Sequence, residues 1–248
     1  MIVTAIRTRR VSAAEMSLTD LLDESIERLE PGTIVGITSK VVSLCENRVV
    51  DPARVDKSEL IESEADRYLP ASSSRYHVFL TIKQNTLIPS AGIDESNTGG
   101  TYVLWPEDPQ RSANAMWKHL VMRHETTELG VIITDSTTSP LRMGVGGIPI
   151  AHAGFRAVND FVGTDDLFGR PLVMTRSNVA AGIAAAAVAV MGEAAEQTPI
   201  ALIRDVPFVE FQRRVPTAEE LSELVIDPED DLYAPVLGCA PWHQGRGR

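Results

Sequence analysis

Cysteine is scarce in this sequence, which has only Cys45 and Cys239 among 248 residues. The two lie far apart and show none of the short spacings that are typical of protein metal sites. Free thiols are typical of a reducing compartment. We therefore expect a cytoplasmic protein without disulfides.

Long apolar segments are also missing. Residues 1–10 lack the apolar stretch of a secretory signal peptide. The most apolar run, residues 179–192, is shorter than the roughly 20 residues that span a bilayer. We therefore expect no association with a membrane.

Positive charge is in deficit. The chain has 23 Lys and Arg residues against 34 Asp and Glu residues, a net charge of −11. Nucleic-acid binding relies on cations that face phosphates, so this composition disfavours it. One anionic small molecule in a locally basic or metal-lined pocket is still compatible with the charge.

Two common nucleotide-binding motifs are absent or out of place. The chain has no Gly-x-x-x-x-Gly-Lys-Ser/Thr segment, the P-loop motif that surrounds phosphates. Its glycine-rich segment, residues 144–147, precedes Ile-Pro-Ile-Ala rather than a helix, whereas the glycine loop of an NAD site opens a helix. A nucleotide site in this chain must therefore be of another kind.

The hydrophobic content of 44% is that of an ordinary globular core. Apolar runs and amphipathic spacing predict strands at 1–6, 33–38 and 130–134 and helices at 17–29, 56–68 and 112–124. We interpret Glu62, Glu64 and Asp66 as a solvated helix face. We expect residues 1–248 to form a single unit, with two subdomains as the alternative and residues 233–248 as a mobile tail.

Polar side chains follow three predicted elements, where loops can present them to a ligand. Asp94 comes after the strand region 76–88, Asp135 and Ser136 after an apolar strand, and Glu193 after an Ala-rich helix. Carboxylate and hydroxyl oxygens are ligands that Mg²⁺ prefers. The sequence therefore predicts one metal–nucleotide site.

Each of these residues also has a simpler interpretation. Asp94 is typical of an ordinary turn, and Lys40, after the strand 33–38, can extend its ammonium group into water. Gly192 can end the Ala-rich helix and leave Glu193 in solvent. A carboxylate at a helix C-terminus is otherwise unfavourable unless a cation compensates for it, which a bound metal would do.

Six short segments carry a resemblance to a known family, the coenzyme F420:L-glutamate ligases, also called F420-0 gamma-glutamyl ligases. They are Ile-Thr-Ser-Lys-Val-Val-Ser at 37–43, Ala-Gly-Ile-Asp-Glu-Ser-Asn at 91–97, Pro-Glu-Asp-Pro at 106–109, Ile-Ile-Thr-Asp at 132–135, Asp-Leu-Phe-Gly at 166–169 and Val-Met-Gly-Glu at 190–193. Because they occur in the family's order, the chain resembles it over residues 33–204. The resemblance implies an α+β fold with mostly antiparallel sheets and packed helices. It also implies a homodimer whose sites lie near the interface.

The resemblance further implies a reaction and a site. GTP, or ATP, phosphorylates an acceptor carboxylate, and the amino group of L-glutamate displaces the phosphate. The implied catalytic residues are Asp94 and Asp135, and the implied ligands of Mg²⁺ or Mn²⁺ are Asp94, Asp135, Ser136 and Glu193, with K⁺ as a further candidate cation. The implied nucleotide-binding residues are Ser39, Lys40, Asn97, Met191, Gly192, Glu193, Ala194, Ala195, Glu196, Gln197 and Thr198.

Departures from the family pattern concern the acceptor. Leu44 replaces a residue that is usually basic, and residues 1–10 and 137–141 also differ from the family. We expect Arg7, Arg9 and Arg142 to grip a carboxylate-bearing acceptor, so a folate-type molecule is an alternative to F420-0. A non-catalytic nucleotide- or metabolite-binding protein and a metal-dependent phosphatase are the rival functions.

Overall fold

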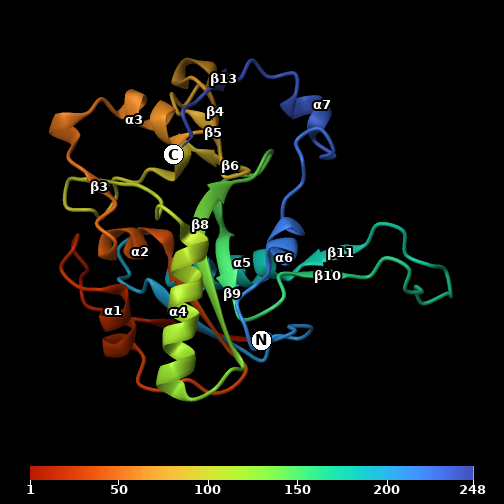
Figure 1. The fold of residues 1–248 in the computed structure, drawn as a ribbon. Helices are drawn as coiled ribbons and strands as arrows, with labels where there is room; N and C mark the ends of the chain where they lie inside the picture. Colours follow the sequence, from red (N-terminus) through yellow and green to blue (C-terminus); the bar gives the residue numbers. More distant parts are fainter. Residues whose placement is uncertain (248) are drawn as a thin grey trace.

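A five-stranded sheet forms the centre of the fold in the computed structural model, which describes residues 1–247 (Figure 1). The strand order is β1-β12-β2-β8-β9; β2 and β8 are parallel, and every other neighbouring pair is antiparallel. The strands are β1 (Ile2–Ile6), β2 (Thr33–Thr38), β8 (Leu129–Thr138), β9 (Val145–Ala153) and β12 (Ile200–Arg204). The expected α+β class with mostly antiparallel pairing is confirmed.

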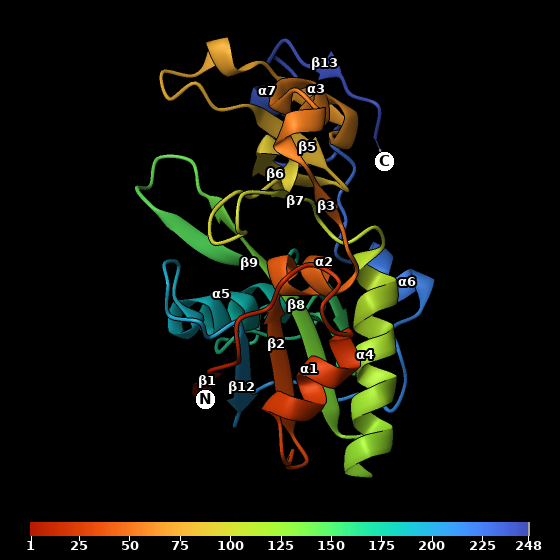
Figure 2. The same cartoon turned by 90° about the vertical axis from the view of Figure 1, so that its left-hand side faces the viewer.

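Helices cover both faces of this sheet. The helices are α1 (Leu18–Ser25), α2 (Ser39–Cys45) and α4 (Pro109–His124) on one face and α5 (Val179–Met191) on the other. Figure 2 shows α4 and α5 on opposite sides of β2 and β8. The sheet buries apolar side chains on both faces, and this burial is the main stabilising contribution to such a core.

Side-chain caps set where two of these helices begin. Ser17 Oγ accepts the backbone N–H of Asp20 at the start of α1, and Asn178 Oδ1 accepts that of Ala181 at the start of α5. Each cap satisfies a donor that the helix itself leaves unpaired. α1 is shorter than the predicted helix over 17–29, because the backbone is already extended at Ile26.

The glycine-rich segment allows β9 and α5 to approach closely. A Cβ on Gly147 would lie 2.5 Å from the carbonyl oxygen of Ala184 and 2.6 Å from a methyl carbon of Val188. No side chain fits at such a distance. Gly146 and Gly147 lie inside β9, which begins at Val145.

A smaller antiparallel sheet lies beside the central one, in the order β13-β4-β5-β6 (Figure 2). Its strands are β4 (Arg67–Leu69), β5 (Leu80–Lys83), β6 (Thr86–Pro89) and β13 (His243–Gln244). With it lie α3 (Lys57–Glu64), the short pair β3 (Val49–Val50) and β7 (Tyr102–Val103), and the 3₁₀ turns η1 (Pro52–Arg54), η2 (Ala71–Ser73) and η3 (Ser90–Gly92). A separate apolar cluster, which includes Leu60, Phe79, Ile93 and Leu104, holds this part together.

Glu64 corrects one expectation from the sequence. It is buried rather than part of a solvated face, and it contacts Lys83, whose side chain is only 2% exposed. Arg48 Nη2 lies 3.3 Å from the same carboxylate. Burial lowers the pKa of Lys83, and the Glu64 carboxylate only partly offsets this. A buried charge of this kind requires such partners.

Two hairpins project from the body. β8 and β9 continue past the edge of the sheet to a tip whose Leu141 and Met143 are almost fully exposed. β10 (Val158–Asp160) and β11 (Arg176–Asn178) form an antiparallel pair whose loop, with exposed Leu167 and Phe168, extends away from the molecule (Figure 1).

The segment for which the sequence predicts a mobile tail contains regular structure. It includes α7 (Ala234–Leu237) and β13, which follow α6 (Ala218–Ser222), and β13 pairs with β4. Backbone N–H groups of Gly245 and Gly247 bond to carbonyls of Asp66 and Ala65. Arg248 lies outside the described residues. In residues 1–247 we find no helix with the length and apolar character needed to cross a membrane.

Candidate functional site

A cavity of about 740 Å³ opens between the two sheets. Its walls come from the ends of β2 and β8, the turn after β6, the loop that carries Asn97 and the segment that follows α5. Because β2 and β8 are parallel, their carboxyl ends reach the same edge of the sheet. Lys40, just after β2, and Asp135, in β8 just past its last pairing with β2, therefore face one space. The carboxyl edge of parallel strands is a common place for ligands in α/β proteins.

The turn that presents Asp94 has an unusual backbone. Ser90, Ala91 and Gly92 have φ angles of 52°, 54° and 71°, in the left-handed region that non-glycine residues rarely adopt. The hydroxyl of Thr81 holds this turn, since it accepts the N–H of Ala91 at 2.8 Å and donates to the carbonyl of Ile88. Such strain persists where surrounding contacts fix it, and it is frequent at functional sites.

Asp94 is paired with Lys40. Lys40 Nζ lies 2.7 Å from Asp94 Oδ2 and donates to the carbonyl and hydroxyl oxygens of Ser96 at 3.0 and 3.1 Å. Burial acts to raise the pKa of Asp94, but the hydrogen bond and charge of Lys40 outweigh it and lower that pKa below its usual value. Asp94 is therefore a carboxylate at neutral pH with a cation already beside it.

Asp135 is held by neutral donors. Trp105 Nε1–H donates to Asp135 Oδ2, and the backbone N–H of Ser136 donates to Oδ1 at 2.8 Å. Burial raises the pKa of Asp135 to about 6, despite these donors, and the charge of Asp94 adds to the rise. The two aspartates therefore differ in electrostatic environment while they line the same cavity.

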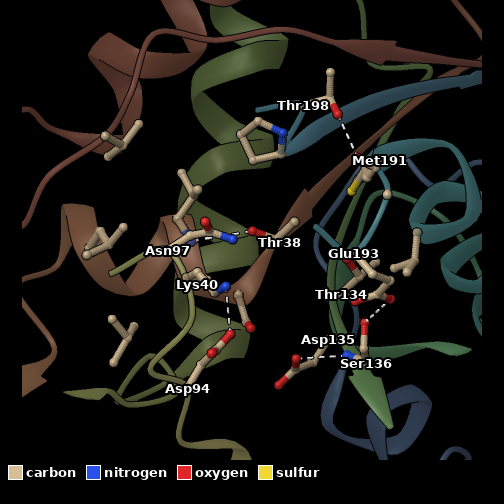
Figure 3. A pocket seen from close by; sticks show the side chains of 18 of the residues that line it. Thr38, Lys40, Asp94, Asn97, Thr134, Asp135, Ser136, Met191, Glu193 and Thr198 are labelled. Carbon is tan, nitrogen blue, oxygen red and sulfur yellow. Dashed lines mark hydrogen bonds and ion pairs between the residues drawn. The ribbon is translucent and has the colours of Figure 1, made fainter. Parts of the chain in front are cut away.

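Glu193 joins the wall that Asp135 forms. Gly192 ends α5 with a φ of 80°, and Glu193 then accepts the hydroxyl of Ser136 at 2.7 Å. Figure 3 shows Lys40, Asp94 and Asn97 on one side of the cavity and Asp135, Ser136 and Glu193 on the other. Gly192 ends α5, as the simpler interpretation expected. The Glu193 carboxylate nevertheless contacts Ser136, another residue that the resemblance implied as a metal ligand.

The segment after α5 forms a further wall. Asn97 Nδ2 donates to the carbonyl of Ala194 at 2.8 Å, and Thr198 Oγ1 donates to that of Met191 at 2.6 Å. Every residue for which the resemblance implied nucleotide binding or metal ligation lines this one cavity. The structure thus brings the predicted set together, while the role of each residue stays a prediction.

The arginines predicted to bind the acceptor lie in different places. Arg9 lines the cavity, but its guanidinium pairs with Glu15 at 2.8 Å and Glu24 at 3.1 Å. Among the described residues that line the cavity, neither Arg7 nor Arg142 is found; Arg142 lies at the exposed tip of the β8–β9 hairpin. Arg10, the third arginine of residues 7–10, does line it.

The metal site is not preformed. Within residues 1–247, no group of three His, Cys, Asp or Glu side chains is arranged to hold a metal ion. The predicted carboxylate ligands instead contact Lys40, Trp105 and Ser136. Their oxygen donors nevertheless match the preference of Mg²⁺ and Mn²⁺. The donor chemistry fits a divalent cation once these side chains exchange partners.

Two residues at this site were not identified from the sequence. Trp105 appeared only as the end of a strand, and Thr81 as part of another. Each acts through a contact with a residue 10 or 30 positions away. No local pattern signals such a contact, and only the fold brings the partners together.

Comparison with known proteins identifies the chain's relatives. The family model described as F420-0:Gamma-glutamyl ligase matches residues 6–205. A coenzyme F420:L-glutamate ligase of Methanopyrus kandleri is 33% identical over 203 residues, 75% of this chain and 80% of that protein. Enzymes of the same name from Methanocaldococcus jannaschii and Methanothermobacter thermautotrophicus are 31% and 34% identical, over 83% and 75% of this chain and 86% and 80% of their own lengths. The chain therefore belongs to the F420-0:gamma-glutamyl ligase family, a family of amide-forming acid–amino-acid ligases.

Proposed function

We propose that this protein uses a nucleoside triphosphate and a divalent metal to join L-glutamate to a carboxylate of a pterin- or deazaflavin-type cofactor. One observation carries the proposal. The residues expected to bind nucleotide and metal, which lie far apart in the sequence, all line one cavity. The family match supports the amide-forming reaction.

The proposed reaction has two steps. An acceptor carboxylate oxygen attacks the γ-phosphorus of the nucleotide, which gives an acyl phosphate and nucleoside diphosphate. The amino group of L-glutamate, as the free amine, then attacks the acyl carbon; inorganic phosphate leaves and the nitrogen loses a proton. Such a reaction requires positioning and charge stabilisation rather than a covalent enzyme nucleophile.

Lys40 is suited to contact the triphosphate. Its ammonium group sits in the cavity, 2.7 Å from Asp94, and lysine binds phosphate as a point charge. When Lys40 turns from Asp94 to a phosphate, the Asp94 carboxylate becomes available as an oxygen ligand. Lys40 and Asp94 thereby neutralise each other's charge until a nucleotide binds.

Asp94, Asp135, Ser136 and Glu193 are the residues that would hold Mg²⁺ or Mn²⁺. A divalent cation between carboxylates and phosphates supplies charge neutralisation at the transferring phosphoryl group. The elevated pKa of Asp135, about 6, reflects a carboxylate whose charge is poorly compensated by its surroundings. A cation would relieve that imbalance.

The acceptor end of the cavity differs from the family pattern. Leu44 lines the cavity and is 4% exposed, where the family usually carries a cation. Arg9 and Arg10 are both exposed and line the cavity on this side, but the guanidinium of Arg9 is paired with Glu15 and Glu24. These features suit an acceptor that presents a carboxylate, as both F420-0 and a folate-type molecule do.

We infer that the protein is a homodimer, as its family resemblance suggested. The outer face of α5 carries exposed Gly182, Ala185 and Ala189 together with Val190, which is 39% exposed. Val145, in the strand on which α5 packs, is 52% exposed. Exposed apolar faces of this kind are typical of subunit interfaces. Light scattering of Ala185→Glu, which should yield a monomer, tests the inference against the parent protein.

Mass spectrometry of reaction products tests the proposed function. F420-0 and a reduced folate are each incubated with L-glutamate, Mg²⁺ and either GTP or ATP; the expected result is a mass gain of one or more glutamyl residues on one acceptor. Phosphate release without acceptor or glutamate would support the phosphatase alternative. Nucleotide binding without turnover on either acceptor would support the binding protein.

A further inference from the structure

Trp105 lies next to the predicted catalytic carboxylate yet has no role in the proposed reaction. It follows β7, is only 2% exposed, and its indole N–H donates to Asp135 Oδ2. The other oxygen of Asp135 accepts the N–H of Ser136 at 2.8 Å. Two donors on two oxygens fix the plane of the carboxylate as well as its position.

Gly92 makes room for this indole. A Cβ on Gly92 would lie 2.2 Å from Trp105 Nε1 and 2.7 Å from its neighbouring ring carbons. No side chain can occupy that position while the ring stays where it is. Gly92 also has a φ of 71°, so the position requires glycine for two separate reasons.

Buried charges fix the backbone of Trp105. Arg48 Nε donates to the Trp105 carbonyl at 3.2 Å, and Arg48 Nη2 lies 3.3 Å from Glu64. Glu64 in turn contacts the buried ammonium group of Lys83. The tryptophan is therefore held from the smaller sheet, while the carboxylate it contacts belongs to the central one.

The chemistry of the donor differs between the two aspartates. Asp94 faces a lysine ammonium group, which cancels its charge. An indole N–H is a donor only and carries no charge, so it orients Asp135 without neutralising it. The two hydrogen bonds of Asp135 therefore bring no positive charge into contact with it.

We propose that Trp105 is a positioning residue, which holds the Asp135 carboxylate in one orientation toward the cavity through its indole N–H. The effect of Trp105 on turnover rests on the proposed function, since it acts through Asp135. The hydrogen bond between Trp105 and Asp135 is independent of the proposed function. Partners of this kind, which orient a ligating carboxylate, commonly change metal affinity or activity by about 10–100-fold when removed.

Trp117 provides a matched control. It is also buried, and its indole N–H donates to the carbonyl of Leu129 at 2.8 Å, away from the cavity. Trp105→Phe and Trp117→Phe therefore each remove one indole hydrogen bond from a buried ring.

Electron paramagnetic resonance measures Mn²⁺ binding by the two variants. We expect Trp105→Phe to weaken this binding about tenfold and to lower kcat by about 10–100-fold. Trp117→Phe should change both by less than about twofold. Equal effects of the two changes would mean that Trp105 is only structural.

A spectroscopic measurement tests the contact without turnover or metal. Trp117→Phe/Trp242→Phe leaves Trp105 as the one tryptophan, since the chain has three. In that background Asp135→Ala should shift the emission maximum of Trp105, because it removes the acceptor of the indole N–H. An unchanged emission maximum in the Asp135 variant would overturn the proposal.

Gly92→Ala gives a second, independent change, because its Cβ would displace the indole. It should weaken Mn²⁺ binding as Trp105→Phe does, with thermal unfolding used to show that the variant is folded. If the wild-type protein neither binds Mn²⁺ nor forms a glutamyl product, the proposed function fails, and the emission measurement still decides whether Trp105 holds Asp135.

Discussion

Thr38 lies directly opposite Thr134 at the last pairing of the parallel strands β2 and β8. The two residues that directly follow each of them line the same cavity: Ser39 and Lys40 on one side, Asp135 and Ser136 on the other. This single parallel pair in an otherwise antiparallel sheet therefore brings a lysine and a carboxylate together from positions almost 100 residues apart.

Lys40→Ala should impair the use of nucleotide. Loss of a charged donor to phosphate is expected to reduce kcat/KM for the nucleotide by about 1.5–3 kcal/mol. Steady-state kinetics at saturating acceptor and glutamate measure it. Lys57→Ala is the matched control, because Lys57, in α3, pairs with Glu95, the residue between the two that Lys40 contacts, and does not line the cavity in the described part of the chain. If the two variants had the same nucleotide kinetics, Lys40 would be an ordinary solvated lysine.

Asp135→Asn should stabilise the metal-free protein at neutral pH. Because the pKa of Asp135 in the folded protein is raised to about 6, the folded state binds this proton more tightly than the unfolded state does. Its contribution to stability is therefore full below pH 4 and is lost as the pH rises through 6. Relative to pH 4, the variant should therefore gain about 1–2 kcal/mol at pH 7, since each pKa unit corresponds to about 1.4 kcal/mol and solvent screens a partly exposed carboxylate.

Urea unfolding of both proteins between pH 3.5 and 7.5 checks this, and the stability of the variant relative to the parent should fall toward the acidic end. A constant difference across the range would show that Asp135 titrates normally. The same variant is expected to lose ligase activity, so stability and function should change in opposite directions.

Thr81→Val should both destabilise the fold and reduce activity. The substitution keeps the shape but leaves the N–H of Ala91 and the carbonyl of Ile88 without the hydroxyl that each contacts. A lost buried hydrogen bond of this kind costs about 1–3 kcal/mol. The turn that carries Asp94 would also lose its anchor, so kcat/KM should fall in the fraction that remains folded.

Thr33→Val is the control for that change. Thr33 is 1% exposed, and its hydroxyl finds no hydrogen-bond partner within residues 1–247, so an isosteric apolar replacement should be neutral or stabilising. Denaturant unfolding compares the two variants. A Thr33 variant as unstable as the Thr81 variant would indicate that neither hydroxyl has a specific role.

The sequence predicted the local parts of this structure well. The strand over 33–38 agrees with the structure, because the spacing of apolar residues acts over a few positions. The expected strand end at Asp135 was wrong: β8 continues to Thr138, since glycines of β9 pair with it there.

Contacts between distant residues were not predictable in the same way. Glu64 was expected to face water because its neighbours are acidic, but Lys83 and Arg48 reach it from other elements and bury it. The contact of Trp105 with Asp135 has the same origin. The resemblance predicted which residues form the site. Only the fold shows which other residues, such as Trp105, hold them in place.

Arg10→Gln should weaken acceptor binding while nucleotide use is unchanged. Arg10 lines the cavity, as Leu44 does, and both belong to the segments that depart from the family pattern; a guanidinium that holds a carboxylate contributes about 1.5–3 kcal/mol. The acceptor KM should therefore rise at least about tenfold with little change in kcat, the pattern of a group that binds ground state and transition state equally.

Arg7→Gln is the matched control: Arg7 is exposed on the same segment and does not line the cavity in the part of the chain that the structure describes. A rise in acceptor KM for Arg7→Gln but not for Arg10→Gln would restore the assignment made from the sequence. A rise for neither would place the acceptor carboxylate elsewhere in the cavity.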